Sequence, residues 1–289
     1  MYPILFSIGP FSLYSFSFFL VVSWCVWSYL FWKHLKASAA AHPAIFDTMF
    51  WITVWGFTVS RIQYVLFHIG QFQSNWLRVF TLWIQPGLGL YFAVLCGVLV
   101  SLWFRKSLKV SNGEIFDAWM YSFPPAYAFG LLGSFLDGGV VGVKSSLPWA
   151  VRYVGSEGLR HPVQLYTIVA IIILYFGFYF AKKNQKVASY FRIPGNTSVW
   201  MGLFLSLILF LIALLTNRVV YLRLVSVNQF VCILVFGQCL GALFVVRGGH
   251  RIVAGKIQNG NSFIRRKLGG LYARISERFA RRHTQTPGS

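Results

Sequence analysis

Gly130-Leu131-Leu132-Gly133-Ser134-Phe135-Leu136-Asp137-Gly138-Gly139-Val140-Val141-Gly142 opens a polar stretch that closes on Arg160-His161-Pro162-Val163-Gln164-Leu165-Tyr166. The stretch joins two long apolar runs and contains two of the six carboxylates of the chain, Asp137 and Glu157. Polar side chains at membrane depth cost several kcal/mol, so these glycines, the Arg-His pair and the glutamine require a functional explanation. We interpret residues 130–166 as the candidate site and the other apolar segments as its frame.

The composition indicates a polytopic membrane protein. Hydrophobic residues make up 57% of the chain, aromatic residues 19% and charged residues 11%, with a mean hydropathy of +0.63. In an ordinary soluble domain, about a quarter of the residues are charged. The four cysteines lie in apolar runs without C-x-x-C spacing or a histidine at ligand spacing, so we expect small core residues rather than a disulfide or a zinc site. The first ten residues lack basic charge, and we expect no cleavable secretory signal.

Seven apolar stretches are long enough to span a bilayer, which needs about 20 residues of apolar helix. The fourth contains Pro124-Pro125, and we expect an interruption there because proline breaks helices. The predicted fold is an all-α polytopic membrane protein with seven transmembrane helices, near residues 11–32, 46–67, 87–104, 115–136, 163–181, 198–216 and 228–247.

Basic residues in the connections predict the orientation, because cytoplasmic loops carry an excess of lysine and arginine. Of the 26 basic residues, 19 follow the first, third, fifth and seventh spans, six lie in the other connections, and Arg61 falls inside the second span. We therefore predict an external amino terminus, a cytoplasmic carboxy terminus and an external loop at residues 137–162.

The formal charge of +20 could also indicate nucleic-acid binding. The positive-inside bias accounts for most of this charge, so we expect no nucleic-acid partner. We divide the chain into a transmembrane domain, residues 1–247, and a basic cytoplasmic tail, residues 248–289, whose apolar positions recur at the spacing of an amphipathic helix on an anionic inner leaflet. Residues 68–86 are rich in tryptophan and predict either an arm on the outer membrane surface or an ordinary loop.

The glycines of the central stretch have two interpretations. Gly138 and Gly142 have the Gly-x-x-x-Gly spacing that lets helix backbones approach closely, which favours a packing role. Alternatively, Gly130, Gly133, Gly138 and Gly142 leave room for a lipid headgroup and expose backbone N–H groups to its phosphate.

Arg160-His161-Pro162 is the sharper motif. Proline is tolerated in the first turn of a helix, so Pro162 predicts the start of the fifth span and places Gln164 and Tyr166 near the outer headgroups. Arg160 and His161 then either mark the end of a span or face a ligand. Arg61 either reaches the outer interface or faces the bundle interior as an anion site, and we favour the interior.

Four segments come in the order and spacing of bacterial prolipoprotein diacylglyceryl transferases, and the chain resembles that family from residue 5 to residue 247. The segments are Phe6-Ser7-Ile8-Gly9-Pro10, Ser60-Arg61-Ile62-Gln63-Tyr64-Val65-Leu66-Phe67, the Gly130–Gly142 stretch and Arg160-His161-Pro162-Val163-Gln164-Leu165-Tyr166. The resemblance implies transfer of diacylglycerol from phosphatidylglycerol to the lipobox cysteine of a prolipoprotein, at the outer face of the bacterial cytoplasmic membrane. It implies no metal or organic cofactor, and the partners would be phosphatidylglycerol, other anionic lipids and prolipoprotein signal peptides.

Several polar positions of the family differ in this chain. The family signature reads Gly-Arg-x-Gly-Asn-Phe-x-Asn-Gly-Glu-x-x-Gly, whereas this chain has Leu131, Ser134, Asp137 and Gly139 at the Arg, Asn, Asn and Glu positions. The family's His, Tyr and Glu positions elsewhere correspond to Tyr91, Phe16 and Thr167. Residues 193–217 contain no basic residue to match an essential arginine of the family.

Two functions from different classes follow. The first is a transferase in which His161 or Tyr91 takes the proton of the thiol, because the thiolate is the nucleophile. Its substrate-binding residues would be Arg61, Arg160, Gly130, Gly133, Ser134, Gly138, Gly142, Gln164 and Tyr166. The second is a catalytically silent member of the family that binds lipid or lipoprotein. A transporter is disfavoured, because no span has the paired charges of an ion pathway.

Overall fold

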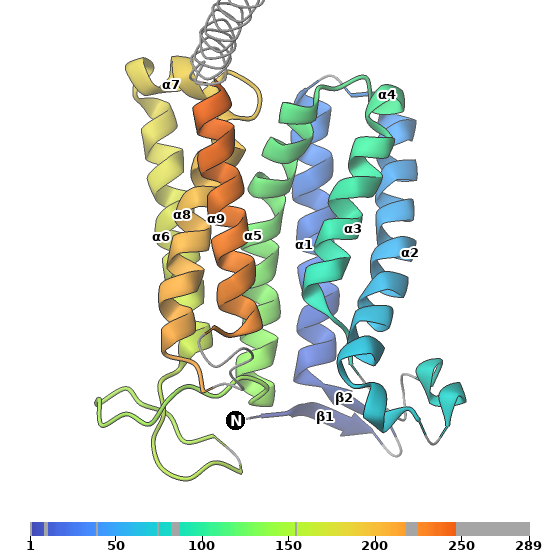
Figure 1. Cartoon of the computed structure of the whole chain (residues 1–289), viewed down its shortest axis with the longest axis vertical. Helices are drawn as coiled ribbons and strands as arrows, with labels where there is room; N and C mark the ends of the chain where they lie inside the picture. The colour runs from blue at the N-terminus through green and yellow to red at the C-terminus, as the bar shows by residue number, and fades with distance from the viewer. Residues whose placement is uncertain are drawn as a thin grey trace, which may run out of the picture. The chain divides into compact units, whose positions relative to one another are not determined.

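The structure is a computed structural model that describes residues 2–8, 11–38, 40–73, 75–81, 87–153, 155–217 and 225–246. The predicted tail, residues 248–289, lies outside these ranges. The elements in chain order are β1 (Ile4–Ile8), β2 (Phe11–Tyr14), α1 (Ser15–Ala37), α2 (His42–Phe67), η1 (Ile69–Gln71), η2 (Trp76–Val79), α3 (Leu90–Trp103), α4 (Arg105–Leu108), α5 (Asn112–Asp137), α6 (Val163–Lys183), α7 (Gln185–Phe191), α8 (Asn196–Leu214) and α9 (Val227–Val246) (Figure 1).

Within the described ranges, seven helices have 14 or more residues, and each overlaps one predicted span. Four of them, α1, α6, α8 and α9, are long and apolar enough to cross a membrane. Helix α3 is apolar but has 14 residues, while α2 and α5 contain charged side chains, among them Arg61 and Asp117. The protein is therefore a helical, multi-pass membrane protein, and the count of seven spans and the orientation stay predictions.

The first long helix begins later than predicted. Residues 11–14 form β2 instead, which pairs antiparallel with β1, Ile4 opposite Tyr14 and Ile8 opposite Phe11. The backbone N–H of Ser15 donates to the carbonyl of Pro3 (2.9 Å), so the hairpin continues up to the first residue of α1. Hydropathy included these residues in the span because short apolar strands and helices have similar patterns.

The interruption expected at Pro124-Pro125 does not occur, because α5 continues through both prolines. The helix starts with a capping box, in which Ser111 Oγ accepts from the N–H of Glu114 (3.3 Å) and the Glu114 carboxylate accepts from the N–H of Ser111 (2.7 Å). Each proline removes one helical N–H donor. Helix α5 packs along α1 more extensively than any other helix pair packs in the described ranges, and Pro124 is fully buried. Tertiary packing therefore outweighs the local preference of the prolines.

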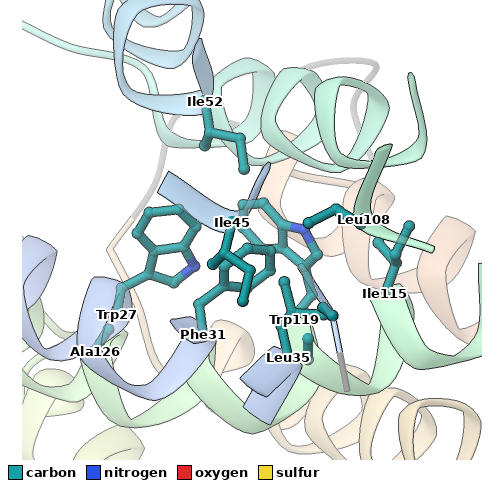
Figure 2. Close-up of a cluster of buried hydrophobic side chains, with 11 residues drawn as sticks. Trp27, Phe31, Leu35, Ile45, Ile52, Leu108, Ile115, Trp119 and Ala126 are labelled. Carbon is teal, nitrogen blue, oxygen red and sulfur yellow. The ribbon is translucent and has the colours of Figure 1, made fainter. Parts of the chain in front are cut away.

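The main apolar core lies between α1, α2, α3 and α5 (Figure 2). Trp27 and Phe31 of α1 stack with ring centroids 5.1 Å apart, and Trp119 of α5 packs on both, at 5.4 and 5.8 Å. The indole N–H of Trp119 donates to Ser101 Oγ of α3 (3.0 Å), so the buried donor is satisfied. A Cβ at Gly97 would lie 2.6 Å from the Trp119 ring, so α3 approaches α5 only with a glycine there.

A carboxylate from another helix caps the start of α8. Asp117 of α5 accepts hydrogen bonds from the backbone N–H groups of Gly195 (2.8 Å) and Ser198 (2.6 Å). A carboxylate at this position satisfies N–H groups that have no partner within the helix and interacts favourably with the helix dipole. The contact ties the start of α8 to α5.

The candidate residues lie mostly at the opposite end of these helices. Figure 1 shows the β1–β2 hairpin, the connection from α2 to α3 and the connection from α5 to α6 at this same end. In the predicted orientation, this end faces the outside of the cell.

Candidate functional site

The predicted site residues fall into three groups. Gly130 and Gly133 lie within α5, and Arg61 and Tyr91 lie where α2 meets the start of α3. The largest group belongs to the connection from α5 to α6 and to the first turns of α6: Gly142, Arg160, His161, Gln164 and Tyr166.

Gly130 and Gly133 of α5 both face α1, and Gly133 serves helix packing. A Cβ at Gly133 would lie 2.6 Å from Cβ of Phe19 and 3.2 Å from Cα of Phe16, and a Cβ at Gly130 would lie 3.7 Å from Oγ of Ser23. All three neighbours belong to α1, and the contact at Gly133 is too short for a Cβ, so Gly133 lets the two helices approach closely, whereas 3.7 Å at Gly130 is an ordinary contact distance. The predicted contact of Gly130 and Gly133 with a lipid headgroup stays a prediction.

The helix-packing interpretation of Gly138 and Gly142 is wrong, because both residues lie beyond the end of α5. Gly138 has φ 77°, the left-handed conformation that commonly ends a helix, and the N–H of Gly139 returns to the carbonyl of Ser134 (3.0 Å). A Cβ at Gly142 would lie 2.2 Å from the carbonyl oxygen of His161. Gly142 thus permits a close approach between two loop segments rather than between two helices.

Leu131 stands where the resemblance expects an arginine. It is buried in an apolar cluster with Ile171 of α6 and Leu205 of α8. Partly buried apolar side chains of the same helices, such as Ile168 and Leu209, surround this cluster. The position therefore contributes to packing between α5, α6 and α8 in this chain, and an arginine in the same place would be a buried charge.

Arg61 faces the interior as predicted, with its side chain 6% exposed. Its guanidinium donates to three backbone carbonyls of the connection from α2 to α3: Val79 from Nε (2.8 Å), Gly87 from Nη1 (3.0 Å) and Arg78 from Nη2 (3.0 Å). It also lies 5.5 Å from the ring centroids of Tyr64 and Phe72. Arg61 therefore holds the η1–η2 segment against α2, and its predicted contact with lipid phosphate stays a prediction.

The sequence predicts an arm on the outer membrane surface or an ordinary loop at residues 68–86, and the η1–η2 segment is part of this stretch. The structure gives it two short 3-10 helices and exposes Trp76, Leu77 and Phe80, whereas Phe72 is fully buried. Exposed aromatic and aliphatic side chains at the end of membrane helices suit the headgroup region. The position of the arm on a membrane surface stays a prediction.

Tyr91 is the second residue of α3, and its hydroxyl donates to Oδ1 of Asn228 in α9. The neighbouring N–H of Phe92 donates to Oε1 of Gln63 (2.9 Å), and the N–H of Gly89 donates to the carbonyl of Ser60 (2.9 Å). These contacts join the start of α3 to α2 and α9. Sequence reasoning did not identify Asn228, since a single amide at the start of a span is a common interfacial residue.

Backbone pairing positions Arg160 and His161. Arg160 and Val151 exchange both backbone hydrogen bonds (3.0 Å each), and the N–H of His161 donates to the carbonyl of Val143 (3.1 Å). The N–H of Val143 in turn donates to the carbonyl of Leu215 (2.9 Å) at the end of α8. The connection is therefore a paired structure, fastened to α8, that delivers the Arg-His pair to the start of α6.

The guanidinium of Arg160 is only partly satisfied. Nη1 donates to the carbonyl of Gly142 (3.2 Å), whereas Nε is buried and has no hydrogen-bond partner among the described residues. An unpaired buried donor on a charged group is costly, and an incoming anion would satisfy it. Among the described residues, Arg160 is thus a predicted site residue with an unsatisfied donor.

His161 is held by a chain of hydrogen bonds. Its Nδ1 lies 3.1 Å from the hydroxyl of Tyr166, one turn into α6, and this hydroxyl accepts from the indole N–H of Trp149 (2.8 Å). When Nδ1 carries the imidazole proton and donates to Tyr166, Nε2 has a free lone pair and can accept a proton. The arrangement therefore allows His161 to act as a general base.

Gln164 belongs to a buried network. It is 1% exposed, its Nε2 donates to the carbonyl of Val140 (2.6 Å), and its Oε1 accepts from the hydroxyl of Tyr153 (3.0 Å). Burial, with a smaller contribution from nearby Tyr166, raises the pKa of Tyr153 to about 12. Gln164 therefore fixes the loop to α6, and its predicted contact with substrate stays a prediction.

Sequence reasoning did not identify Trp149, which contacts Tyr166, or Tyr153, which contacts Gln164. Both lie in an irregular connection, where no periodicity indicates which side chains turn inward. Within the described ranges, no group of three or more His, Cys, Asp or Glu side chains is arranged to hold a metal ion.

Comparison with known proteins gives a consistent result. A family model described as prolipoprotein diacylglyceryl transferase matches residues 3–246. Three similar proteins are each named phosphatidylglycerol–prolipoprotein diacylglyceryl transferase. The protein from Zymomonas mobilis is 28% identical over 212 residues, which cover 66% of this chain and 74% of that protein. The proteins from Synechocystis sp. and Pseudoalteromonas atlantica are 26% and 27% identical, covering 64% and 65% of this chain and 70% and 68% of their own lengths.

Proposed function

The chain belongs to the prolipoprotein diacylglyceryl transferase family, and we propose that it transfers diacylglycerol from phosphatidylglycerol to the lipobox cysteine of prolipoproteins. The observation that carries this proposal is the family match over residues 3–246, which contains the whole paired connection from α5 to α6. The names of the similar proteins support phosphatidylglycerol and prolipoproteins as substrates. The comparisons give no support to the alternative of a catalytically silent lipid-binding protein.

The proposed topology has seven transmembrane helices with an external amino terminus. It is supported by seven long helices at the predicted positions and by the asymmetric distribution of basic residues. The connection from α5 to α6 then faces the outside, where secreted prolipoproteins arrive, and the basic tail at residues 248–289 is cytoplasmic.

In the proposed reaction, the thiolate of the lipobox cysteine attacks the glyceryl carbon next to the phosphate. A sulfur–carbon bond forms, the carbon–oxygen bond to the phosphate breaks, and glycerol phosphate leaves. The thiol proton passes to Nε2 of His161, whose Nδ1 is held by Tyr166. We assign the base to His161 rather than to Tyr91, because the hydroxyl of Tyr91 donates its proton to Oδ1 of Asn228 and is not placed to accept one.

The departing phosphate needs a counter-charge, because negative charge accumulates on its oxygens in the transition state. Arg160 fits this role through its unpaired Nε. Arg61 is the second proposed counter-charge. The backbone turns at Gly138 and Gly142, with Ser134 nearby, would border the headgroup.

The test is transfer of labelled diacylglycerol to a lipobox peptide in membranes that contain the protein. We expect His161→Ala to lower the rate by about 100-fold or more, the range for removal of a general base, and Tyr91→Phe to lower it much less. His42→Ala serves as the matched control, because His42 is an exposed histidine at the start of α2.

Two outcomes would contradict parts of this proposal. A wild-type signal that survives His161→Ala would refute the assignment of the base. A wild-type protein that shows no transfer above background, although correctly inserted, would refute catalysis and favour the silent alternative.

A further inference from the structure

A second cationic site lies at the other end of the helices, where α6 turns into α7. A shallow, open hollow with a volume of about 210 Å³ is lined by Lys182, Ala188, Phe191 and Arg192. Lys182 belongs to the last turn of α6, and Arg192 directly follows α7. The turn between the two helices therefore brings two basic side chains to one hollow, which we call the elbow site.

Neither basic side chain of the elbow site has a hydrogen bond or an ion pair with the residues that the structure describes. One carboxylate, Asp117, interacts electrostatically with Lys182. Both oxygens of Asp117, however, already accept backbone N–H groups at the start of α8. Two basic side chains with open donors at one surface hollow are chemically suited to a phosphate group.

Aromatic rings continue the elbow site along the helices. Phe191 packs edge-on against Phe178 of α6, with centroids 5.5 Å apart, and Phe178 lies 6.3 Å from Phe204 of α8. Phe204 in turn stacks on Trp200 (6.0 Å) and remains exposed. The site thus has basic side chains at one end and an apolar surface that continues along two membrane helices. This arrangement complements a phospholipid, which has a charged headgroup and apolar chains, better than it complements a soluble anion.

We propose that the elbow site binds the phosphate of an anionic phospholipid of the cytoplasmic leaflet, with its acyl chains against Phe178 and Phe204. The assignment to this leaflet rests on the orientation proposed above. Lys182 and Arg192 contact the phosphate oxygens, and Phe191 lies between the headgroup and the chains. The site is separate from the outer-end groups that are proposed to catalyse transfer.

The test uses the full chain in phosphatidylcholine vesicles with a small fraction of phosphatidic acid that carries a photoreactive group in its acyl chain. After illumination, mass spectrometry maps the labelled peptides. We expect labelling on α6 and α8 near Phe178 and Phe204. The double variant Lys182→Gln/Arg192→Gln should reduce this labelling at least ten-fold, and Lys182→Arg/Arg192→Lys should retain it because the charges remain.

The matched control is Arg105→Gln/Lys106→Gln, which also removes two positive charges, here from exposed positions of α4. An equal loss of labelling in this control would overturn the proposal, because the attraction would then be general surface charge. Labelling that persists in the Lys182→Gln/Arg192→Gln variant would also overturn it. Displacement by inorganic phosphate as effectively as by unlabelled phosphatidic acid would overturn the lipid assignment in favour of a soluble anion. Labelling does not require transfer activity, so a wild-type protein without transfer would leave this result unaffected.

Discussion

His161 is positioned by Tyr166 rather than by Arg160, its neighbour in the sequence. The hydroxyl of Tyr166 lies 3.1 Å from Nδ1 of His161 and is itself fixed by the indole N–H of Trp149. A base held at one ring nitrogen presents the other in a defined direction, which is the usual way in which proteins orient a catalytic imidazole. In the proposed reaction, the adjacent residues Arg160 and His161 have two separate functions, an anion contact and a proton acceptor.

The side chains of Gln164 and Arg61, in contrast, make structural contacts within the protein. Both were predicted to bind substrate, and both direct their described hydrogen bonds to the protein itself. A buried amide or guanidinium must satisfy several donors, and nearby backbone carbonyls do so at low cost. Their structural contacts explain why a transferase scaffold would need these residues even apart from any contact with lipid.

Tyr153 gives a pH-dependent prediction for stability. Burial raises the pKa of Tyr153 to about 12, whereas an unfolded tyrosine titrates near 10. The folded protein therefore binds this proton more tightly, so the contribution to stability is fully present below about pH 10 and is lost as the pH rises toward about 12. We expect the thermal unfolding midpoint in detergent to fall more steeply between pH 10 and 12 in the wild type than in Tyr153→Phe.

The control for Tyr153 is Tyr2→Phe, which removes the hydroxyl of an exposed tyrosine and should leave the pH dependence unchanged. If wild type and Tyr153→Phe show the same slope over this range, another group is responsible for the alkaline loss of stability.

At the scale of secondary structure, local sequence signals and contacts from other segments together determine where helices begin and end. Helix α1 starts where the β1–β2 hairpin ends, and α5 ends on Gly138 in the left-handed conformation. Helix α6 starts directly after Pro162, at the backbone pairing that holds His161. The local preference of each sequence and its tertiary partner agree at these three boundaries.

The start of α8 depends on Asp117, and removing this carboxylate tests that dependence. Asp117→Ala leaves two N–H groups of α8 without their acceptor, so we expect it to lower the free energy of unfolding by roughly 1.5–3 kcal/mol, the range for a hydrogen bond to a charged group. Asp117→Asn should cost less, because the amide oxygen still accepts one hydrogen bond. Reversible unfolding in mixed detergent micelles measures both changes.

Asp47→Ala is the comparison for Asp117, since Asp47 is an exposed carboxylate in α2. Equal destabilisation by Asp47→Ala and Asp117→Ala would show that loss of negative charge, and not loss of the cap on α8, is the cause.

At the scale of the whole molecule, the two ends of the described helices differ chemically. One end carries the paired connection with Arg160 and His161, and the other carries the elbow site and the carboxylate cap of α8. In the proposed topology, the first end meets secreted substrates and the second meets the cytoplasmic leaflet. The bundle would therefore separate the proposed transfer reaction from the anionic-lipid contact that we infer.

Accessibility of single cysteines tests the proposed topology. In a variant without the four native cysteines, Glu157→Cys should react with a membrane-impermeant maleimide in intact cells, because residue 157 lies in the connection assigned to the outside. Lys186→Cys should react only after the cells are opened, because α7 is assigned to the cytoplasm. The reverse labelling pattern would show that the orientation is opposite to the proposed one. Labelling of both positions in intact cells would contradict an odd number of spans between residues 157 and 186.

The sequence by itself determined the class of the protein, the places of the long helices and the family. Long apolar runs indicate membrane-spanning segments regardless of how the helices pack. The order of the four motifs was sufficient to identify the family, and the match over residues 3–246 confirms it. The interior position of Arg61 and the helix start after Pro162 also followed from local rules.

Only the tertiary structure decided what these residues touch. The carbonyls bound by Arg61 come from Arg78, Val79 and Gly87, and α5 continues through Pro124-Pro125 because it packs along α1. Trp149 and Tyr153 belong to the candidate site because they form hydrogen bonds with Tyr166 and Gln164, respectively. Hydropathy and helix propensity are properties of short segments, whereas a hydrogen-bond partner depends on which distant segment the folded chain brings close, and no local pattern contains that information.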